Sequence, residues 1–353
     1  MVLAIAPVNV VYSQGFAGLG TTAEGYDVPN PETKITFPKD HGSHPGFRIE
    51  WWYLTANLKG TDGKDYGAQW TLFRSALQPP DKEQKKEKPN NWFGSQLWMA
   101  HAAVTARHNH WVAESRARGN IGLAGVSASP FKAWINDWSM TGDKSSGISN
   151  LRVQASGTDF SYDLNLQANG PIIFHGANGY SVKSSLGQAS HYYSQPFYRV
   201  DGMLNLPHGE VAVTGSAWLD REWSSQPLGE KQKGWDWASL NFDDGSKLMG
   251  FRLRQDDGKN FTSGTWIDAD GKTTPFSNGK IKFIEEARST INGKEIPTKW
   301  RLLLPEKQVD IEFEAINSNS WMATSVPYWE GPVTIKGSHT GRGYLEMTGY
   351  DSR

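Results

Sequence analysis

Apolar and polar residues alternate with a period of two along much of the chain, which predicts β-strands. One such run extends over residues 50–58, turns at a Gly-Thr-Asp-Gly segment, and continues over residues 66–73. Two alternating runs joined by a short glycine turn predict a β-hairpin. The plan recurs over residues 235–242 and 247–253, and both second strands end in Phe-Arg. A weak internal duplication of an all-β unit is the simplest interpretation.

Glycine turns punctuate the rest of the chain. They lie at residues 256–258, 268–271 and 292–293, each between strand-like runs. Turns spaced by roughly 8–12 residues are typical of a β-barrel or a β-sandwich. Helical patterns are sparse, and the best helical candidate, residues 131–138, also fits a strand. We therefore predict an all-β fold.

The 353 residues favour two domains. Turn-forming residues cluster at 201–209, so we place the domains at residues 37–205 and 206–353. Residues 1–36 form an N-terminal arm or a signal-peptide remnant. Their apolar run, residues 2–12, is too short to span a membrane but resembles the end of a secretory signal. The charged segment 78–91 predicts a solvated loop, with a lid over a cavity as the alternative.

Composition narrows the function classes. The net charge of -1 argues against nucleic-acid binding, which usually goes with a large basic excess. The absence of cysteine excludes disulfides, cysteine nucleophiles and thiolate metal sites. No segment is long and apolar enough to predict a transmembrane span. The high tryptophan count of 16 fits aromatic strands between glycine turns.

Several tryptophan-bearing segments also contain acids and arginines. They are residues 48–53, 218–223, 234–237 and 328–331. Carboxylates beside buried tryptophans must be paired or hydrogen-bonded if their surroundings are dry. This mixture predicts either a cavity with an aromatic wall and a charged floor, or barrel ends filled by tryptophan.

Two of these acids share one face of a strand. Side chains alternate along a strand, so Asp220 and Glu222 point one way while Arg221 and Trp223 point the other. Two carboxyl groups beside an apolar wall can include one with a raised pKa, able to donate a proton at neutral pH. Such a group suits general acid catalysis on an alkene, an ester or an acetal.

Asp236 and Glu50 are two further acid candidates. Asp236 lies opposite the face that Trp235 and Trp237 share, and Glu50 opens its strand on the same face as Arg48. For all four acids the alternative is a structural network of ion pairs. The arginines available for it are Arg48, Arg74, Arg221 and Arg252.

The histidines show no metal-binding spacing, and no Gly-x-Ser-x-Gly nucleophile motif is present. We therefore predict no metal site. His101, within an apolar run, and His191, before two tyrosines, are the best candidates for proton transfer. A buried, hydrogen-bonded imidazole is the alternative for each.

Taken together, the motifs resemble the AttH-like branch of the carotenoid 1,2-hydratase (hydroxyneurosporene synthase) superfamily. The resemblance covers residues 37–350 and rests on residues 50–54, 134–138, 175–180, 189–194, 218–223, 234–237, 328–331 and 343–350. It implies two lipocalin-like antiparallel β-barrel domains and an exported protein associated with an ABC-type export system. It also implies an apolar ligand and, in hydratase members, addition of water to a terminal double bond without an organic cofactor.

One position departs from the hydratase branch, which has a histidine where this chain has Arg221. Arginine does not donate protons near neutral pH, so the substitution argues against carotenoid hydration. Other relatives are pericyclases or lipid-handling proteins, and the fold alone does not fix the chemistry.

We thus predict a periplasmic or secreted protein that binds a hydrophobic, lipid- or terpenoid-like small molecule and hydrates or hydrolyses it by acid catalysis. The catalytic candidates are Asp220, Glu222, Asp236, Glu50 and His191. The ligand-binding candidates are Trp52, Tyr53, His101, Tyr192, Tyr193, Arg221, Trp223, Trp235, Trp237, Arg252 and Trp329. The alternative is a non-enzymatic carrier or an accessory subunit of an ABC-type export system, and a filled barrel would leave only a scaffold.

Overall fold

The computed structural model describes residues 23–80, 95–119, 121–145, 147–226, 228 and 231–350. Nearly all of this chain forms antiparallel strands, and the helical elements described are two short 3-10 turns, η2 (Lys39–His41) and η3 (Pro305–Lys307). The all-β fold predicted from the sequence is confirmed. The apolar run at residues 2–12 and most of the charged segment 78–91 lie outside the described residues.

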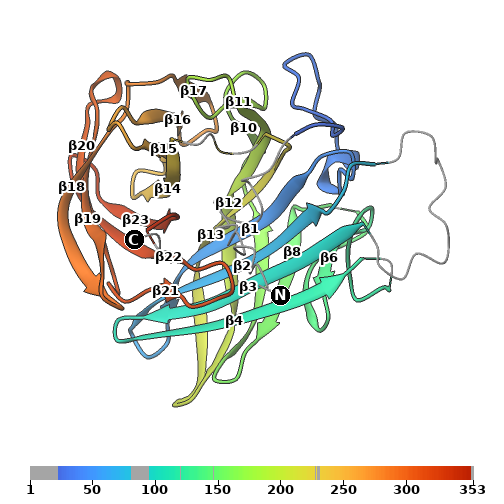
Figure 1. Ribbon diagram of the computed structural model, residues 1–353. Helices are drawn as coiled ribbons and strands as arrows, with labels where there is room; N and C mark the ends of the chain where they lie inside the picture. Colours follow the sequence, from blue (N-terminus) through green and yellow to red (C-terminus); the bar gives the residue numbers. More distant parts are fainter. Residues whose placement is uncertain are drawn as a thin grey trace, which may run out of the picture.

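The first sheet contains 13 strands of the described chain and curls into a nearly closed barrel (Figure 1). Its order is β4-β3-β2-β1-β13-β12-β9-β8-β7-β6-β5, and β10 and β11 pair with β12. The strands are β1 (Ile49–Gly60), β2 (Asp65–Ala76), β3 (Gln96–Ala106), β4 (Asn109–Arg118), β5 (Ala124–Ala128), β6 (Phe131–Ile135), β7 (Trp138–Gly142), β8 (Asn150–Ser156), β9 (Ser161–Ala168), β10 (Ile173–Phe174), β11 (Tyr180–Val182), β12 (Ala189–Leu206) and β13 (Gly209–Ser224). Trp52, Trp70 and Tyr198 are among the large side chains that fill its interior.

The second sheet contains ten strands of the described chain and forms a half-barrel. Its order is β17-β16-β15-β14-β23-β22-β20-β19-β18, and β21 pairs with β22. The strands are β14 (Gln232–Phe242), β15 (Lys247–Gln255), β16 (Phe261–Ile267), β17 (Thr273–Phe276), β18 (Lys282–Ile291), β19 (Lys294–Leu304), β20 (Val309–Ala315), β21 (Trp321–Met322), β22 (Tyr328–Gly337) and β23 (Gly341–Met347). Trp300, Phe313 and Trp329 lie at the centre of its core.

Both predicted hairpins are confirmed, as β1–β2 and β14–β15. In each, an acid on the first strand lies opposite an arginine on the second. Glu50 faces Arg74 across one hairpin, and Asp236 faces Arg252 across the other. The recurring Phe-Arg ending therefore supplies the arginine that neutralises a buried acid, which supports the inferred duplication.

Two local features bear on the sequence-based expectations. Residues 131–135 form strand β6 and Trp138 begins β7, so the strand alternative for residues 131–138 is confirmed over the helix, because Phe131, Ala133 and Ile135 are buried in alternation. The expected domain boundary at 205–206 falls within the β12–β13 hairpin, since both strands pair inside the first sheet. The change of sheet lies between Ser224 and Gln232, and the turn residues at 207–209 instead reverse the chain between neighbouring strands.

The two sheets pack through their outer faces (Figure 1). The packing is close enough that a Cβ at Gly67 of β2 would lie 2.7 Å from Cγ of Pro332 on β22. The Tyr53 hydroxyl donates a hydrogen bond to Glu330 across this contact at 2.6 Å. Central strands such as β1 and β13 therefore have one face in a barrel and the other in the contact between sheets, which we call the seam. No helix in the part of the chain described here has the length and apolar character needed to cross a bilayer.

The Glu50 carboxylate is the charged centre of the first barrel. It accepts hydrogen bonds from Nε of Arg74 and, at 2.6 Å, from Nη2 of Arg221, and its side chain is completely buried. Burial raises the pKa of the Glu50 carboxyl. The positive charges of Arg74 and Arg221 lower it by a larger amount, so the pKa of Glu50 lies below its usual range.

We predict that Glu50→Ala lowers the free energy of unfolding by about 3–5 kcal/mol, because it leaves two buried guanidinium groups without their shared anion. Chemical denaturation followed by tryptophan fluorescence measures this loss. Glu312→Ala is the matched control, since it breaks an exposed pair with Lys299 at 2.8 Å and is expected to cause no measurable change. Equal effects of the two substitutions would contradict the prediction.

Candidate functional site

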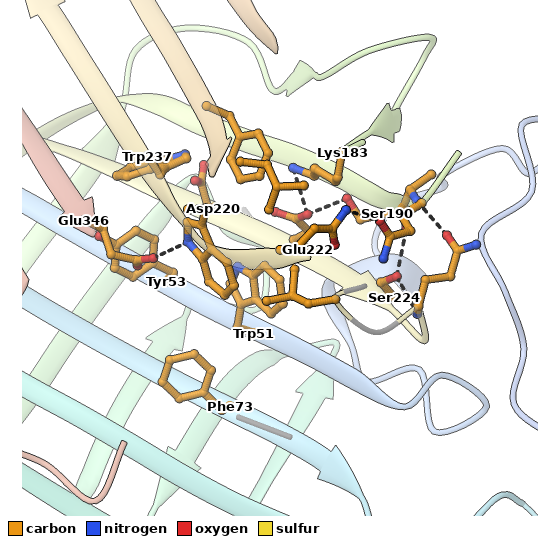
Figure 2. Close-up of a pocket in the computed structure, with 18 of the residues that line it drawn as sticks. Trp51, Tyr53, Phe73, Lys183, Ser190, Asp220, Glu222, Ser224, Trp237 and Glu346 are labelled. Carbon is orange, nitrogen blue, oxygen red and sulfur yellow. Dashed lines mark hydrogen bonds and ion pairs between the residues drawn. The ribbon is translucent and has the colours of Figure 1, made fainter. Parts of the chain in front are cut away.

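A cavity of about 100 Å³ lies in the seam, outside both barrel interiors (Figure 2). This volume has room for several water molecules. Its aromatic wall comes from both sheets and includes Trp51, Tyr53, Phe73, Trp237 and Phe251. Its polar groups include the acids Asp220, Glu222 and Glu346, with Lys183 and Ser190 at one end. An apolar wall with a few convergent polar groups is typical of a small-molecule site.

Each sheet contributes the same cross-strand set of Phe, Trp and Glu to this cavity. The sets are Phe73–Trp51–Glu222 across β2, β1 and β13, and Phe251–Trp237–Glu346 across β15, β14 and β23. In each recurring Phe-Arg pair the phenylalanine faces the cavity and the arginine faces the barrel, as strand alternation requires. The duplicated hairpins thus face one another and form a cavity with approximate two-fold character.

Asp220 is the most heavily hydrogen-bonded acid of the cavity. Its carboxyl accepts from Nε1 of Trp218 at 2.5 Å, from the Tyr192 hydroxyl at 2.6 Å and from Oγ of Ser194. Burial raises its pKa to about 7, and these three donors offset only part of that effect. Near neutral pH the group is therefore divided between carboxylic acid and carboxylate, the condition under which a carboxyl can donate a proton.

Glu346 is a second carboxyl of this kind, approaching from the other sheet. Burial raises its pKa to about 7, and the charges of Asp220 and Glu222 contribute in the same direction. Its Oε1 accepts a hydrogen bond from Nε1 of Trp235 at 2.7 Å. The third acid of the cavity, Glu222, forms an ion pair with Nζ of Lys183 at 2.9 Å.

Glu330 lies behind the cavity wall. It is the register partner of Glu346 on the neighbouring strand β22, and its side chain is fully buried. Burial, together with the nearby Glu346 carboxyl, raises the pKa of Glu330 well above its usual value. The protonated form of this carboxyl is therefore favoured, and it is held against the Tyr53 hydroxyl.

A hydrogen-bonded chain fixes the position of Asp220 from the side away from the cavity. Oγ of Ser194 lies 2.6 Å from Nε2 of His175, and Nδ1 of His175 lies 2.9 Å from Oγ1 of Thr265 in the second sheet. Burial lowers the pKa of His175 well below its usual value, so the imidazole is neutral. The chain joins both sheets to the acid and orients its carboxyl group.

The structure confirms that Asp220 and Glu222 share one face and that Trp235 and Trp237 share another, all four lining the cavity. Tyr53 lines it as well, and Tyr192 contacts Asp220 from the same side. The structure thus brings these predicted residues together at one cavity, and their catalytic or ligand-binding roles stay predictions.

The other candidates point away from the cavity. The first barrel encloses Glu50, Trp52, His191, Tyr193, Arg221 and Trp223, and the second encloses Asp236, Arg252 and Trp329. His101 faces the seam but does not line the cavity. The guanidinium of Arg221 lies 3.7 Å from the centre of the Trp52 ring and binds Glu50, so the departure from the hydratase branch falls outside the cavity. Catalytic or ligand-binding roles for these residues stay predictions.

Sequence reasoning missed part of the site. The missed residues include Trp51, Phe73, Lys183, Phe251 and Glu346. Trp51 shares a strand face with Tyr53 and could have been found by alternation, and the repeated Phe-Arg endings pointed to the two phenylalanines. Nothing local marked Glu346 or Lys183. Over the described residues, no group of three or more His, Asp or Glu side chains is arranged to hold a metal ion.

Comparisons with known proteins agree with the two-sheet β fold. A family model described as AttH-like matches residues 28–350. The crystal structure of a protein described as AttH from Nitrosomonas europaea is 32% identical, covers 92% of this chain and 99% of its own, and superposes with a TM-score of 0.81. Kievitone hydratase from Nectria haematococca has 14% identity, coverage of 93% and 99%, and a TM-score of 0.66. The protein CghA has 12% identity, coverage of 86% and 88%, and a TM-score of 0.51. No curated protein matches the sequence.

The raised pKa of Asp220 predicts a specific pH dependence of stability. The carboxyl titrates near its ordinary value of 3.8 when unfolded and at about 7 when folded, so the unfolded chain has lost a proton that the folded protein keeps. Stability therefore falls as the pH rises from about 4 to 7, by up to about 1.4 kcal/mol per pH unit for this group.

We expect Asp220→Asn to remove this contribution and make the dependence less steep across that interval, while the contribution of Glu346 remains, measured as denaturant midpoints from pH 4 to pH 8. The same slope in wild type and variant would show that Asp220 does not titrate as described. Asp163→Asn, on the exposed surface of β9, is the control and leaves the slope over this interval unchanged.

Proposed function

This chain belongs to the AttH-like family, and we propose that it is a cofactor-free hydratase that adds water to a carbon–carbon double bond of an apolar ligand in the seam cavity. The observation that carries the proposal is the Asp220 carboxyl, whose pKa is about 7, at an aromatic wall between the two sheets. Kievitone hydratase shares this fold, and its name supports the proposed class of reaction.

The residues present account for each step of such a reaction. The Asp220 carboxylic acid gives its proton to one alkene carbon, which forms a C–H bond and leaves a carbocation at the other carbon. The faces of Trp51 and Trp237 stabilise this cation. Water then forms the C–O bond and releases a proton that returns to Asp220, either directly or by way of the Glu346 carboxylate. One water molecule is added overall, and the protein returns to its starting state.

The polar end of the cavity bears on ligand orientation. Lys183 and Ser190 lie at the opposite end from Glu346 and Tyr53 (Figure 2). Oxygen atoms of a ligand would find hydrogen-bond donors there, while its apolar double bond would lie among the tryptophans. We therefore propose a lipid- or terpenoid-like ligand with one oxygenated end.

Other roles rest on the sequence. A non-enzymatic carrier fits the same cavity, because binding needs only the aromatic wall. Hydrolysis would use the same acids on an ester or acetal. Export to the periplasm or beyond the cell, and association with an ABC-type export system, stay predictions from the family resemblance.

The test is incorporation of heavy oxygen. The protein is incubated with acyclic terpenoids and unsaturated fatty alcohols in ¹⁸O-labelled water, and products that have gained one labelled water are detected by mass spectrometry. We predict that Asp220→Asn slows the formation of labelled product by about 10²–10⁴-fold, because it removes the general acid. Glu312→Gln, on the outer surface of the second sheet, leaves the rate unchanged.

Native mass spectrometry of the same mixtures separates the alternatives. A bound ligand without labelled product at any pH would overturn the hydratase proposal and leave the carrier. Absence of both binding and labelling throughout the panel would remove the apolar-ligand proposal itself.

A further inference from the structure

A row of side chains that can donate and accept protons connects the surface of the first barrel with the cavity wall. We propose that this row is a proton path between solvent and the cavity. Its members, from the surface inward, are Glu114, His101, Tyr328, Glu330 and Tyr53. None of them is needed to explain the proposed proton transfer from Asp220, and they come from both sheets.

The outer end reaches solvent through Glu114 on β4. The side chain of Glu114 is 19% exposed, and its carboxylate contacts Nη2 of Arg116 at 2.7 Å and the hydroxyl of Ser325. Burial raises the pKa of the Glu114 carboxyl. The hydrogen bonds of His101, Arg116 and Ser325 together lower it by a larger amount, so Glu114 is a carboxylate at neutral pH. Across β3 and β4, its Oε1 lies 3.4 Å from Nε2 of His101.

The middle of the path is an imidazole in the seam. His101 is fully buried, its Nδ1 lies 3.1 Å from the Tyr328 hydroxyl, and the two rings stack with centroids 5.6 Å apart. Burial lowers the pKa of His101, and the neutral ring can donate at one nitrogen while accepting at the other. It can therefore pass a proton from Glu114 to Tyr328 without carrying a lasting charge.

The inner end leads into the cavity. Tyr328 and Glu330 lie two residues apart on β22, so both side chains point to the seam, and the tyrosine hydroxyl hydrogen-bonds the carboxyl. Oε1 of Glu330 in turn lies 2.6 Å from the hydroxyl of Tyr53, which lines the cavity. In this inner half of the path, each group that passes the proton is a hydroxyl or carboxyl group, which can both donate and accept a proton.

The transfer balances as a shift of hydrogen bonds. As the Tyr53 hydroxyl gives its proton to a base in the cavity, the Glu330 carboxyl protonates Tyr53 and Tyr328 protonates Glu330. Nδ1 of His101 then protonates Tyr328, while Nε2 receives a proton from Glu114, which has taken one from water. One proton enters the cavity, and Glu114 returns to the carboxylate form.

The chemistry of these groups favours a proton path over a purely structural hydrogen-bond network. Where the structure neutralises a buried acid inside a barrel, it uses arginine, as at Glu50 and Asp236. Glu330 instead is held by two hydroxyl groups, Tyr53 and Tyr328, each of which can relay a proton. The use of the path in turnover rests on the proposed hydratase activity, but its existence does not.

The experiment measures how fast the Glu330 proton exchanges with solvent. Protein is transferred into D₂O, and the shift of the carboxylic-acid C=O band is followed by infrared spectroscopy. The Glu330 component is identified as the band that Glu330→Gln removes. We expect Tyr328→Phe, which deletes only the relaying hydroxyl, to slow this exchange by about tenfold or more, since the proton then waits for local opening of the seam.

Glu114→Gln is the second variant, chosen because it changes a partly exposed residue and leaves the interior intact; it is expected to slow the exchange as well. Tyr198→Phe is the control, since its hydroxyl binds the Ile148 carbonyl inside the first barrel, and its exchange stays at the wild-type rate. Wild-type exchange in both Tyr328→Phe and Glu114→Gln would overturn the path. Slowed exchange in a protein that forms no ¹⁸O-labelled product would support the proton path and contradict only the proposed hydratase activity.

Discussion

The contact between the outer faces of the two sheets is the constraint on which the rest of the structure depends. It covers the central parts of β1, β2 and β13 with β14, β15 and β23, so these parts have no face in water. Polar side chains there are buried on one side or the other, whereas Lys59, Glu210 and Lys233 near the strand ends are exposed. Since a buried polar group is costly without a partner, the sequence must supply a partner for each.

The structure supplies partners for these buried polar groups in two different ways. On the barrel side, Glu50 and Asp236 form ion pairs with arginines. On the seam side, Asp220, Glu346 and Glu330 meet hydroxyl and indole donors instead, and burial raises their pKa. The same residue type thus becomes a structural anion on one strand face and a proton-holding group on the other.

The sequence predicted what depends on neighbours along the chain. Hairpins, turns and the shared face of Asp220 and Glu222 follow from local alternation. It could not tell which face of a doubly covered strand enters the barrel, because both faces are apolar there. Trp52 was therefore chosen as a ligand contact although Trp51, beside it, lines the cavity.

Two other parts of the structure depended on pairing between distant strands. The turn signals at residues 201–209 are the same whether the next strand opens a new sheet or pairs within the old one. Glu346 reaches Asp220 only because β23 pairs with β14 and the two sheets then meet face to face. No local pattern encodes that meeting. It follows from the packing of two complete sheets, which a reading of neighbouring residues does not capture.

Placing the cavity in the seam separates chemistry from stability. A substitution at a seam-facing position alters the cavity, while the next residue along the strand keeps its place in the barrel core. Relatives with 14% and 12% identity retain the fold, which agrees with a core that tolerates such changes. The same arrangement lets side chains of both sheets meet in the cavity wall, as they do in the row from Glu114 to Tyr53.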